Sequence, residues 1–120
     1  MQIDQTSQKP IFLQIAESIE DAILSGAFPE ESQIPSITEL SVSYQINPAT
    51  ANKGINLLVD SGILYKKRGI GMFVATDSVE SLLEKRREKF YLNYIENLVS
   101  EAKRLQIPLN EIVEMIKRGY

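Results

Sequence analysis

The short polar side chains between residues 47 and 56 have the types and spacing that contact DNA. Asn47, Thr50, Asn52, Lys53 and Asn56 would face away from the apolar side of a helix. An asparagine amide can bond adenine through two hydrogen bonds, threonine can touch a phosphate or a thymine methyl group, and lysine can reach guanine or phosphate. The segment therefore predicts a helix that contacts bases and phosphates.

A cationic cluster, Lys66-Lys67-Arg68-Gly69, follows this segment. Glycine lets a backbone approach DNA closely, and Arg68 at the tip of a turn can enter a minor groove, where narrow tracts concentrate negative potential. Taken alone, polar residues on a short helix are more often simply solvated, and such a run beside glycine is usually a soluble hairpin. The two clusters together, in this order, are much more specific for DNA than either one.

The composition removes most catalytic chemistry. The 120 residues include no cysteine and no histidine, which excludes disulfides, zinc ribbons, cysteine nucleophiles and histidine-dependent triads or metal sites. Carboxylate pairs such as Glu17 with Asp21 lie on exposed helical faces, so we expect no catalytic residue, metal or cofactor. Because there is no membrane-length apolar run and no signal-peptide core, a cytoplasmic location is expected.

Spacing and chain breakers predict the elements that position these clusters. The first nine residues form a flexible arm or a short edge strand. Ser36 with Glu39 forms a capping box, and Asn47-Pro48 opens the next helix. A loop is expected over 27–35. The expected elements are helices over 10–25, 37–44 and 49–60, and strands over 63–67 and 72–75.

From Ser78 the composition changes to that of a helical tail. Residues 80–104 contain no glycine or proline and predict one long helix, and Pro108 opens a last helix. Two helices cannot bury an apolar stripe this wide by themselves, so the tail predicts dimerisation. The residues expected in the dimer interface are Phe90, Tyr94, Ile95, Leu98, Val99, Leu105, Ile112 and Ile116.

The predicted fold is mostly α with a small β-hairpin: a winged helix-turn-helix head (residues 1–77) and a two-helix dimerisation tail (residues 78–120). In such heads the third helix enters the major groove and the second crosses the backbone. A homodimer would bind an inverted repeat in double-stranded DNA. The centres of its half-sites would be ~34 Å, or a small multiple of that distance, apart. The alternatives are a winged-helix protein-interaction module without DNA binding, and a carboxylate enzyme, which would need a cleft holding two acids that the sequence of the head does not obviously provide.

Several motifs carry a family resemblance over about residues 3–75: Pro10–Ile15, Ile23–Phe28, Ile34–Ser36, Asn47–Thr50, Ser61–Gly62 and Gly69–Val74. In these the chain resembles GntR-type transcriptional regulators, and its short tail resembles that of the YtrA subfamily. The resemblance implies a regulator of an adjacent operon. It also implies DNA contacts at Ser36 on the second helix, at Asn47, Ala49, Thr50, Asn52 and Lys53 on the third, and at Arg68 and Gly69 in the wing.

Three positions depart from the family pattern. Relatives usually carry arginine, a major DNA contact, where this chain has Thr38, and glycine where it has Glu31. They usually carry alanine where it has Gly54, which should loosen that helix by ~1 kcal/mol. The full set of residues expected to contact DNA is Ser36, Thr38, Asn47, Ala49, Thr50, Asn52, Lys53, Lys67, Arg68 and Gly69. No residue points to a small-molecule effector, although one could bind at the dimer interface.

The net charge of −3 argues at first sight against nucleic acid, since DNA-binding domains are usually basic. The head is even more acidic than the tail, because residues 1–77 hold five Lys and Arg against nine Asp and Glu. Four of those five cations nevertheless fall on the expected third helix and wing. The acidic balance therefore predicts weak non-specific affinity for DNA and does not exclude binding.

Overall fold

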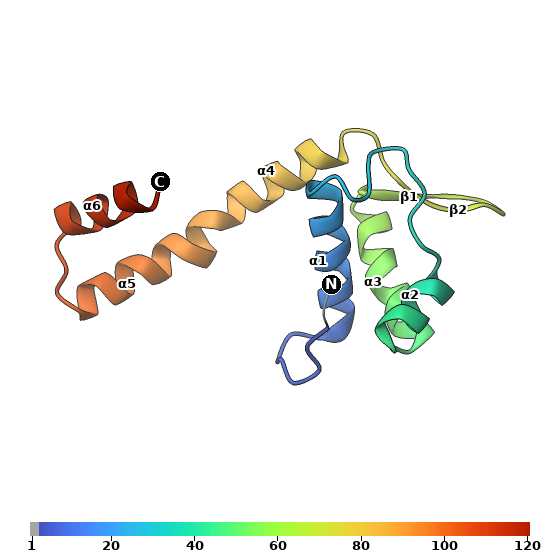
Figure 1. Cartoon of the computed structure of the whole chain (residues 1–120), viewed down its shortest axis with the longest axis horizontal. Coiled ribbons are helices and arrows are strands. Elements are labelled where there is room, and N and C mark those ends of the chain that lie inside the picture. Colours follow the sequence, from blue (N-terminus) through green and yellow to red (C-terminus); the bar gives the residue numbers. More distant parts are fainter. Residues whose placement is uncertain (1–2) are drawn as a thin grey trace. The chain divides into compact units, whose positions relative to one another are not determined.

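The computed structural model describes residues 3–120. The chain divides into two compact units, Met1–Leu83 and Glu84–Tyr120, and each is described by itself. The first unit contains α1 (Ile11–Leu24), α2 (Ile37–Tyr44), α3 (Pro48–Asp60), the strands β1 (Leu64–Lys67) and β2 (Gly71–Val74), and the start of α4 (Ser78–Phe90). This order confirms the predicted mostly helical fold with a small hairpin (Figure 1). The domain boundary expected after residue 77 coincides with the start of α4, whereas the two compact units divide six residues later, after Leu83.

The core of the first unit lies where α1 packs against α3. Ile15, Ile19 and Ile23 follow one another at single-turn spacing on α1, and all three are buried. Ile55 and Leu58 of α3 belong to the same buried cluster. In Figure 1 α1 lies on one side of α3, while α2 and the hairpin lie on the other. Packing on both sides fixes the orientation of α3.

Gly54 determines how closely α1 and α3 approach each other. A Cβ atom built on Gly54 would lie 2.8 Å from the carbonyl oxygen of Phe12 and 3.1 Å from Cγ2 of Ile15. The first of these is a backbone atom within α1, so relieving the clash requires a shift of the helix itself. The sequence predicts that this glycine loosens α3, whereas the structure shows that close helix packing requires it.

Both helices of the helix-turn-helix begin with the caps that the sequence predicts. Ser36 Oγ accepts a hydrogen bond from the Glu39 N–H, and Glu39 Oε1 accepts one from the Ser36 N–H, each at 3.0 Å. Asn47 Oδ1 accepts from the Ala49 N–H at 2.8 Å, and Pro48 is the first residue of α3. The caps fix the first turns of α2 and α3, where half of the predicted DNA contacts lie.

The hairpin has an additional extended neighbour. β1 and β2 pair antiparallel, with Leu64 opposite Val74. On the other edge of β2, the Glu31 N–H donates to the Val74 carbonyl at 2.7 Å and the Ile34 N–H donates to the Met72 carbonyl at 3.0 Å. The sequence predicts only a loop before α2, because this pairing is too short to produce an alternating apolar pattern.

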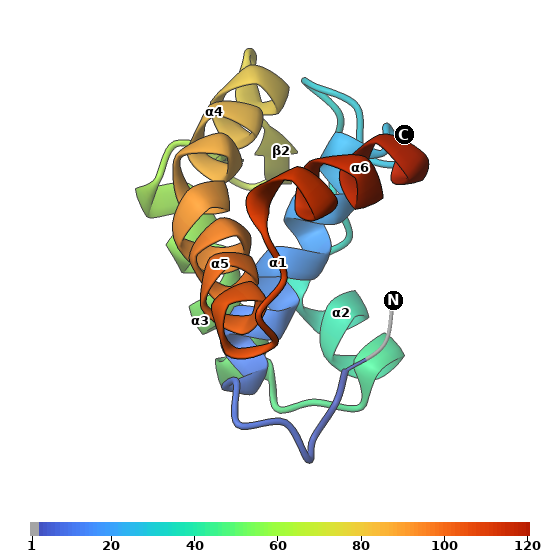
Figure 2. The same cartoon turned by 90° about the vertical axis from the view of Figure 1, so that its left-hand side faces the viewer.

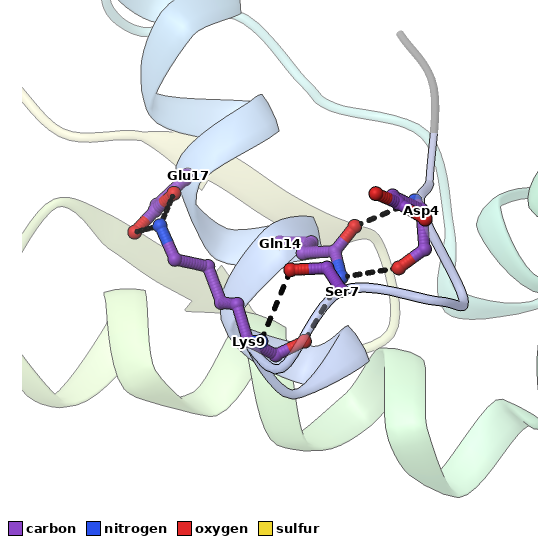
Figure 3. A network of polar contacts seen from close by, with 5 residues as sticks. All are labelled: Asp4, Ser7, Lys9, Gln14 and Glu17. Atoms are coloured by element: carbon purple, nitrogen blue, oxygen red, sulfur yellow. Dashed lines mark hydrogen bonds and ion pairs between the residues drawn. The ribbon is translucent and has the colours of Figure 1, made fainter.

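The described residues before α1 are bound to that helix by hydrogen bonds and an ion pair. Residues 1 and 2 of the predicted arm lie outside the described residues. The Gln14 side chain accepts from the Asp4 N–H at 2.7 Å and donates to the carbonyls of Asp4 and Lys9 at 2.8 and 2.9 Å. Lys9 Nζ forms an ion pair with Glu17 at 2.8 Å (Figure 3). The segment loops back to the first turn of α1 (Figure 2) and forms turns where the sequence suggested a flexible arm or an edge strand.

The second unit is helical. The end of α4 continues into a π-helical turn, η1 (Tyr91–Ile95), and then into α5 (Glu96–Arg104). The long helix predicted over 80–104 therefore contains one π turn. Beyond Arg104 the chain turns back into α6 (Leu109–Gly119), as Figure 1 shows. None of the helices in the described part of the chain combines the length and hydropathy that a membrane crossing needs.

The apolar side chains of the second unit stay largely exposed in the single chain. Among residues 84–120, all of which are described, only Ala102 is buried. Phe90, Tyr94, Val99, Leu105 and Ile116 are exposed, and the remaining residues of the expected interface, Ile95, Leu98 and Ile112, are half-buried. Exposed apolar patches of this kind are typical of protein interfaces.

The contact at Gly54 predicts that Gly54→Ala destabilises the protein. Alanine improves helix propensity by about 1 kcal/mol, but overpacking against the α1 backbone costs about 1–3 kcal/mol, so the net effect is zero to ~2 kcal/mol of lost stability. Urea unfolding measures the difference. Gly119→Ala, a helical glycine with open space around it, is the matched control and loses no stability. A clear gain in stability for Gly54→Ala would contradict the packing constraint.

Candidate nucleic-acid interface

The first half of α3 presents one exposed polar face. The opposite side of the helix is buried in the core. The exposed residues of the polar face are Ala49, Asn52, Lys53 and Asn56, with Thr50 half-buried at its edge. The oxygen of Asn47 serves the cap, so its amide nitrogen is the group suited to donate to a phosphate or a base. The face therefore combines amide groups with one cation, which are the groups that contact base edges and phosphates.

Lys53 is anchored on the neighbouring helix. Its Nζ lies 4.1 Å from the centroid of the Phe12 ring, in the first turn of α1. An aromatic ring attracts an ammonium group to its face, so the cation is held on the α1 side of α3. Phe12 is absent from the residues that the sequence predicts for the interface. Its spacing matches the apolar face of the first helix, and no local pattern distinguishes it from a core residue.

The start of α2 contributes Ser36 and Thr38, both exposed. The Ser36 oxygen accepts from the backbone within the capping box. Thr38 offers a short hydroxyl where the family resemblance leads us to expect arginine. The hydrogen bond from the Ser36 backbone is the main cause that lowers the pKa of Glu39. This element therefore places an ionised carboxylate beside its two predicted DNA contacts, which weakens its attraction for phosphate.

A tight turn at the end of the hairpin exposes Arg68. The Ile70 N–H donates to the Lys67 carbonyl at 2.9 Å, which places Arg68 and Gly69 at the two corners. Gly69 has φ +76°, a conformation that favours glycine at the second corner. Lys67 Nζ lies 4.3 Å from the centroid of the Phe73 ring, so its cation is held against the hairpin. The turn thus carries one exposed arginine and one aromatic-bound lysine.

Gln33 braces this turn from the segment before α2. Its Nε2 donates to the Ile70 carbonyl at 3.0 Å. A Cβ atom on Gly71 would lie 2.5 Å from the same nitrogen, so the brace requires glycine at that position. The sequence predicts Gly71 as part of the turn but gives no indication of Gln33, because the two residues meet only through the pairing of residues 31–34 with β2.

Two consecutive glutamates fasten the base of the hairpin and the start of α4. Glu31 accepts hydrogen bonds from the hydroxyls of Tyr65, at 2.7 Å, and Thr76. Glu30 accepts from the backbone N–H groups of Asp77 and Val79 at 3.0 and 3.1 Å. Glu31 has φ +68°, a conformation that favours glycine, which is the residue that the family resemblance leads us to expect here. The side-chain bonds of Glu31 offset the cost of that backbone conformation.

The charges of the first unit are separated along the chain. Residues 40–76 contain four of its cations, Lys53, Lys66, Lys67 and Arg68, and a single acid, Asp60 at the end of α3. The other acids of the head precede residue 40, except Asp77. The α3 face and the hairpin turn are therefore locally basic in a head of net negative charge. Among residues 3–120, no group of three Asp or Glu side chains is arranged to hold a metal ion.

Three helices followed by a braced two-stranded hairpin, with a polar face on the third helix, define a winged helix-turn-helix protein. The model of the family "Bacterial regulatory proteins, gntR family" matches residues 12–74, and the chain belongs to that family. This confirms the resemblance drawn from the sequence motifs.

Two similar proteins align with nearly the whole chain, and a third aligns with part of it. The transcriptional repressor YtrA of Bacillus subtilis is 27% identical over 98% of this chain and 89% of its own length. The crystal structure of a putative GntR-family regulator from Bacteroides thetaiotaomicron is 34% identical, with a TM-score of 0.73 over 92% of this chain and 99% of its own. The crystal structure of AraR(DBD) in complex with operator ORE1 is 32% identical, with a TM-score of 0.56 over 62% of this chain and 94% of its own. The chain is thus a regulator similar to YtrA, and its relatives are not enzymes.

The Glu31 contacts predict a pH-dependent contribution to stability. Hydrogen bonds, first from Thr76 and then from Tyr65, lower the pKa of Glu31 below its ordinary value of 4.5. A lowered pKa in the folded chain stabilises the fold at pH values above 4.5, and this contribution is lost as the pH falls through the lowered pKa. Glu31→Gln should therefore unfold at lower urea concentration than the wild type at neutral pH, and the gap should close in acid.

Tyr65→Phe is the matched control for that measurement, because it removes one of the two donors and leaves the carboxylate. The difference in urea midpoint between Tyr65→Phe and the double variant Tyr65→Phe/Glu31→Gln should change less with pH than the difference between the wild type and Glu31→Gln. A gap between wild type and Glu31→Gln that stays constant from neutral to acidic pH would show that these hydrogen bonds do not favour the ionised carboxylate.

Proposed function

We propose that the chain is a homodimeric repressor that binds an inverted-repeat operator. The exposed face of α3 enters the major groove, and the turn at Arg68 and Gly69 reaches the minor groove of the same half-site. Ser36 and Thr38 contact the phosphate backbone beside it. Repression then follows because the bound dimer blocks RNA polymerase.

The observation that carries this proposal is the charge separation within the first unit. A protein-docking module has no need to collect four cations between residues 40 and 76 while the rest of the head is strongly acidic. Phosphate neutralisation by Lys and Arg supplies most of non-specific DNA affinity, so these residues mark the surface that faces DNA. The similar protein AraR(DBD) is in complex with operator ORE1, and this supports operator binding by a chain of this fold.

The second copy of the chain is proposed from the second unit. Tyr94 is 65% exposed and Leu105 59% exposed, and both contribute to the exposed apolar surface of residues 90–120. A monomer would leave this surface in water, whereas an identical copy can cover it through a self-complementary contact. Two heads held in this way can bind both halves of an inverted repeat.

Arg68→Ala tests the DNA-binding surface. An operator is first selected from a random DNA pool with the full-length protein, and its dissociation constant is then measured against salt. Loss of one cation from the DNA-binding surface of each protomer should weaken binding and flatten the log–log salt slope by about 0.9 per lost charge. Arg104→Ala, which removes the same charge from an exposed ion pair with Glu101, should leave the slope unchanged.

If the full-length protein selects no DNA sequence from the pool, the proposed function is contradicted and a protein-docking role is favoured. Equal salt slopes for the wild type and Arg68→Ala would instead show that the turn does not contact DNA.

Truncation after Lys89 tests the dimer. Removal of residues 90–120 deletes the exposed apolar surface, so the protein should sediment as a monomer and bind the selected operator much more weakly. Ile116→Lys in the full-length chain places a charge on the same surface and should shift the equilibrium in the same direction. Persistence of the dimer in the truncated chain would mean that another surface joins the protomers.

A further inference from the structure

Phe12 and Lys53 form a pair that joins α1 to the exposed face of α3. The Lys53 Nζ lies 4.1 Å from the centroid of the Phe12 ring, well within the range of a cation–π interaction. Phe12 is half-buried and Lys53 is exposed, so one side of the ammonium group meets the ring while the rest remains open to a ligand. The ring therefore restricts a flexible side chain without neutralising its charge.

The pairing separates Lys53 from the asparagines of the same face. Successive residues of an α-helix are rotated by about 100°, so Lys53 and Asn52 point in different directions around α3. The ring holds the Lys53 ammonium toward α1, at the edge of the face, whereas Asn52 and Asn56 have no such tether in the described structure. Phosphates line both sides of the major groove, and a cation that is held to one side of the recognition helix is directed toward one of those sides.

We propose that Phe12 is a positioning residue that holds Lys53 as a phosphate contact, which leaves base recognition on α3 to Asn52 and its neighbours. This role rests on the proposed DNA-binding function. The ring limits the rotamers of Lys53 before DNA arrives, so less side-chain entropy is lost on binding. An ammonium that contacts phosphate contributes affinity for every sequence and preference for none.

The close approach at Gly54 makes this arrangement possible. Gly54 follows Lys53 directly, and its missing side chain lets the Phe12 backbone come near enough that an added Cβ would lie 2.8 Å from its carbonyl oxygen. The residue that packs α1 against α3 thereby also places the Phe12 ring beside Lys53.

A double-variant cycle on DNA binding tests the pair, with Phe12→Leu, Lys53→Met and their combination in the full-length protein. Phe12→Leu keeps an apolar residue but removes the ring, and it should weaken operator binding about two- to fivefold while the salt slope stays near that of the wild type. Lys53→Met should weaken binding to operator and to unrelated DNA by the same factor and flatten the slope by about 0.9 per protomer. In the Lys53→Met background, Phe12→Leu should cause no further loss.

Phe12→Tyr is the matched control, because it retains an aromatic face, and it should bind the operator like the wild type. Unfolding of each variant without DNA confirms that folded proteins are compared. An equal loss from Phe12→Leu in both backgrounds, or an equal loss from Phe12→Leu and Phe12→Tyr, would overturn the positioning role. A change of base preference in Lys53→Met would overturn the assignment to phosphate. Absence of DNA binding by the wild-type protein would overturn the proposed function itself.

Discussion

The close packing of α1 against α3 is the constraint on which the rest of the first unit depends. Gly54 lets the two backbones approach, and the isoleucines of α1 then bury the inner side of α3. Because that side is fixed, the opposite side with its amides is presented in one orientation. The caps at Ser36 and Asn47 begin the two helices at defined residues, so the exposed side chains have a fixed frame.

The acidic head is compatible with DNA binding because its carboxylates and most of its cations lie in different places and make different contacts. Glu30 and Glu31 accept hydrogen bonds from backbone and hydroxyl groups at the base of the hairpin, and Glu17 of α1 forms an ion pair with Lys9. These carboxylates stabilise the frame, while the other four cations of the head lie on α3 and the hairpin. Thr38 stands where the family resemblance leads us to expect arginine, so a major contact expected from α2 is missing. The proposed DNA contacts of Lys53 and Arg68 therefore carry more of the binding than they would in a basic head.

Local patterns predict most of the fold, because caps, glycines and apolar spacing act over a few residues. The helices α1 to α3 and the hairpin follow from such patterns, as does the exposed stripe of the second unit. The strand-like segment at Gln33, the π turn at Tyr91–Ile95 and the ring contact of Phe12 depend on residues distant in sequence or on subtle changes of helix register. The same limit applies to Gly54, whose role becomes visible only when α1 is placed beside it.

The central claim is that the exposed face of α3 and the hairpin turn contact DNA together. Titration of the isotopically labelled protein with its selected operator, followed through backbone amide chemical shifts, tests it most directly. The largest shifts should fall on residues 47–56 and 67–71, with little change on the outer face of α1 at Glu17 and Asp21. Shifts concentrated on α1, or confined to only one of the two predicted elements, would contradict the account.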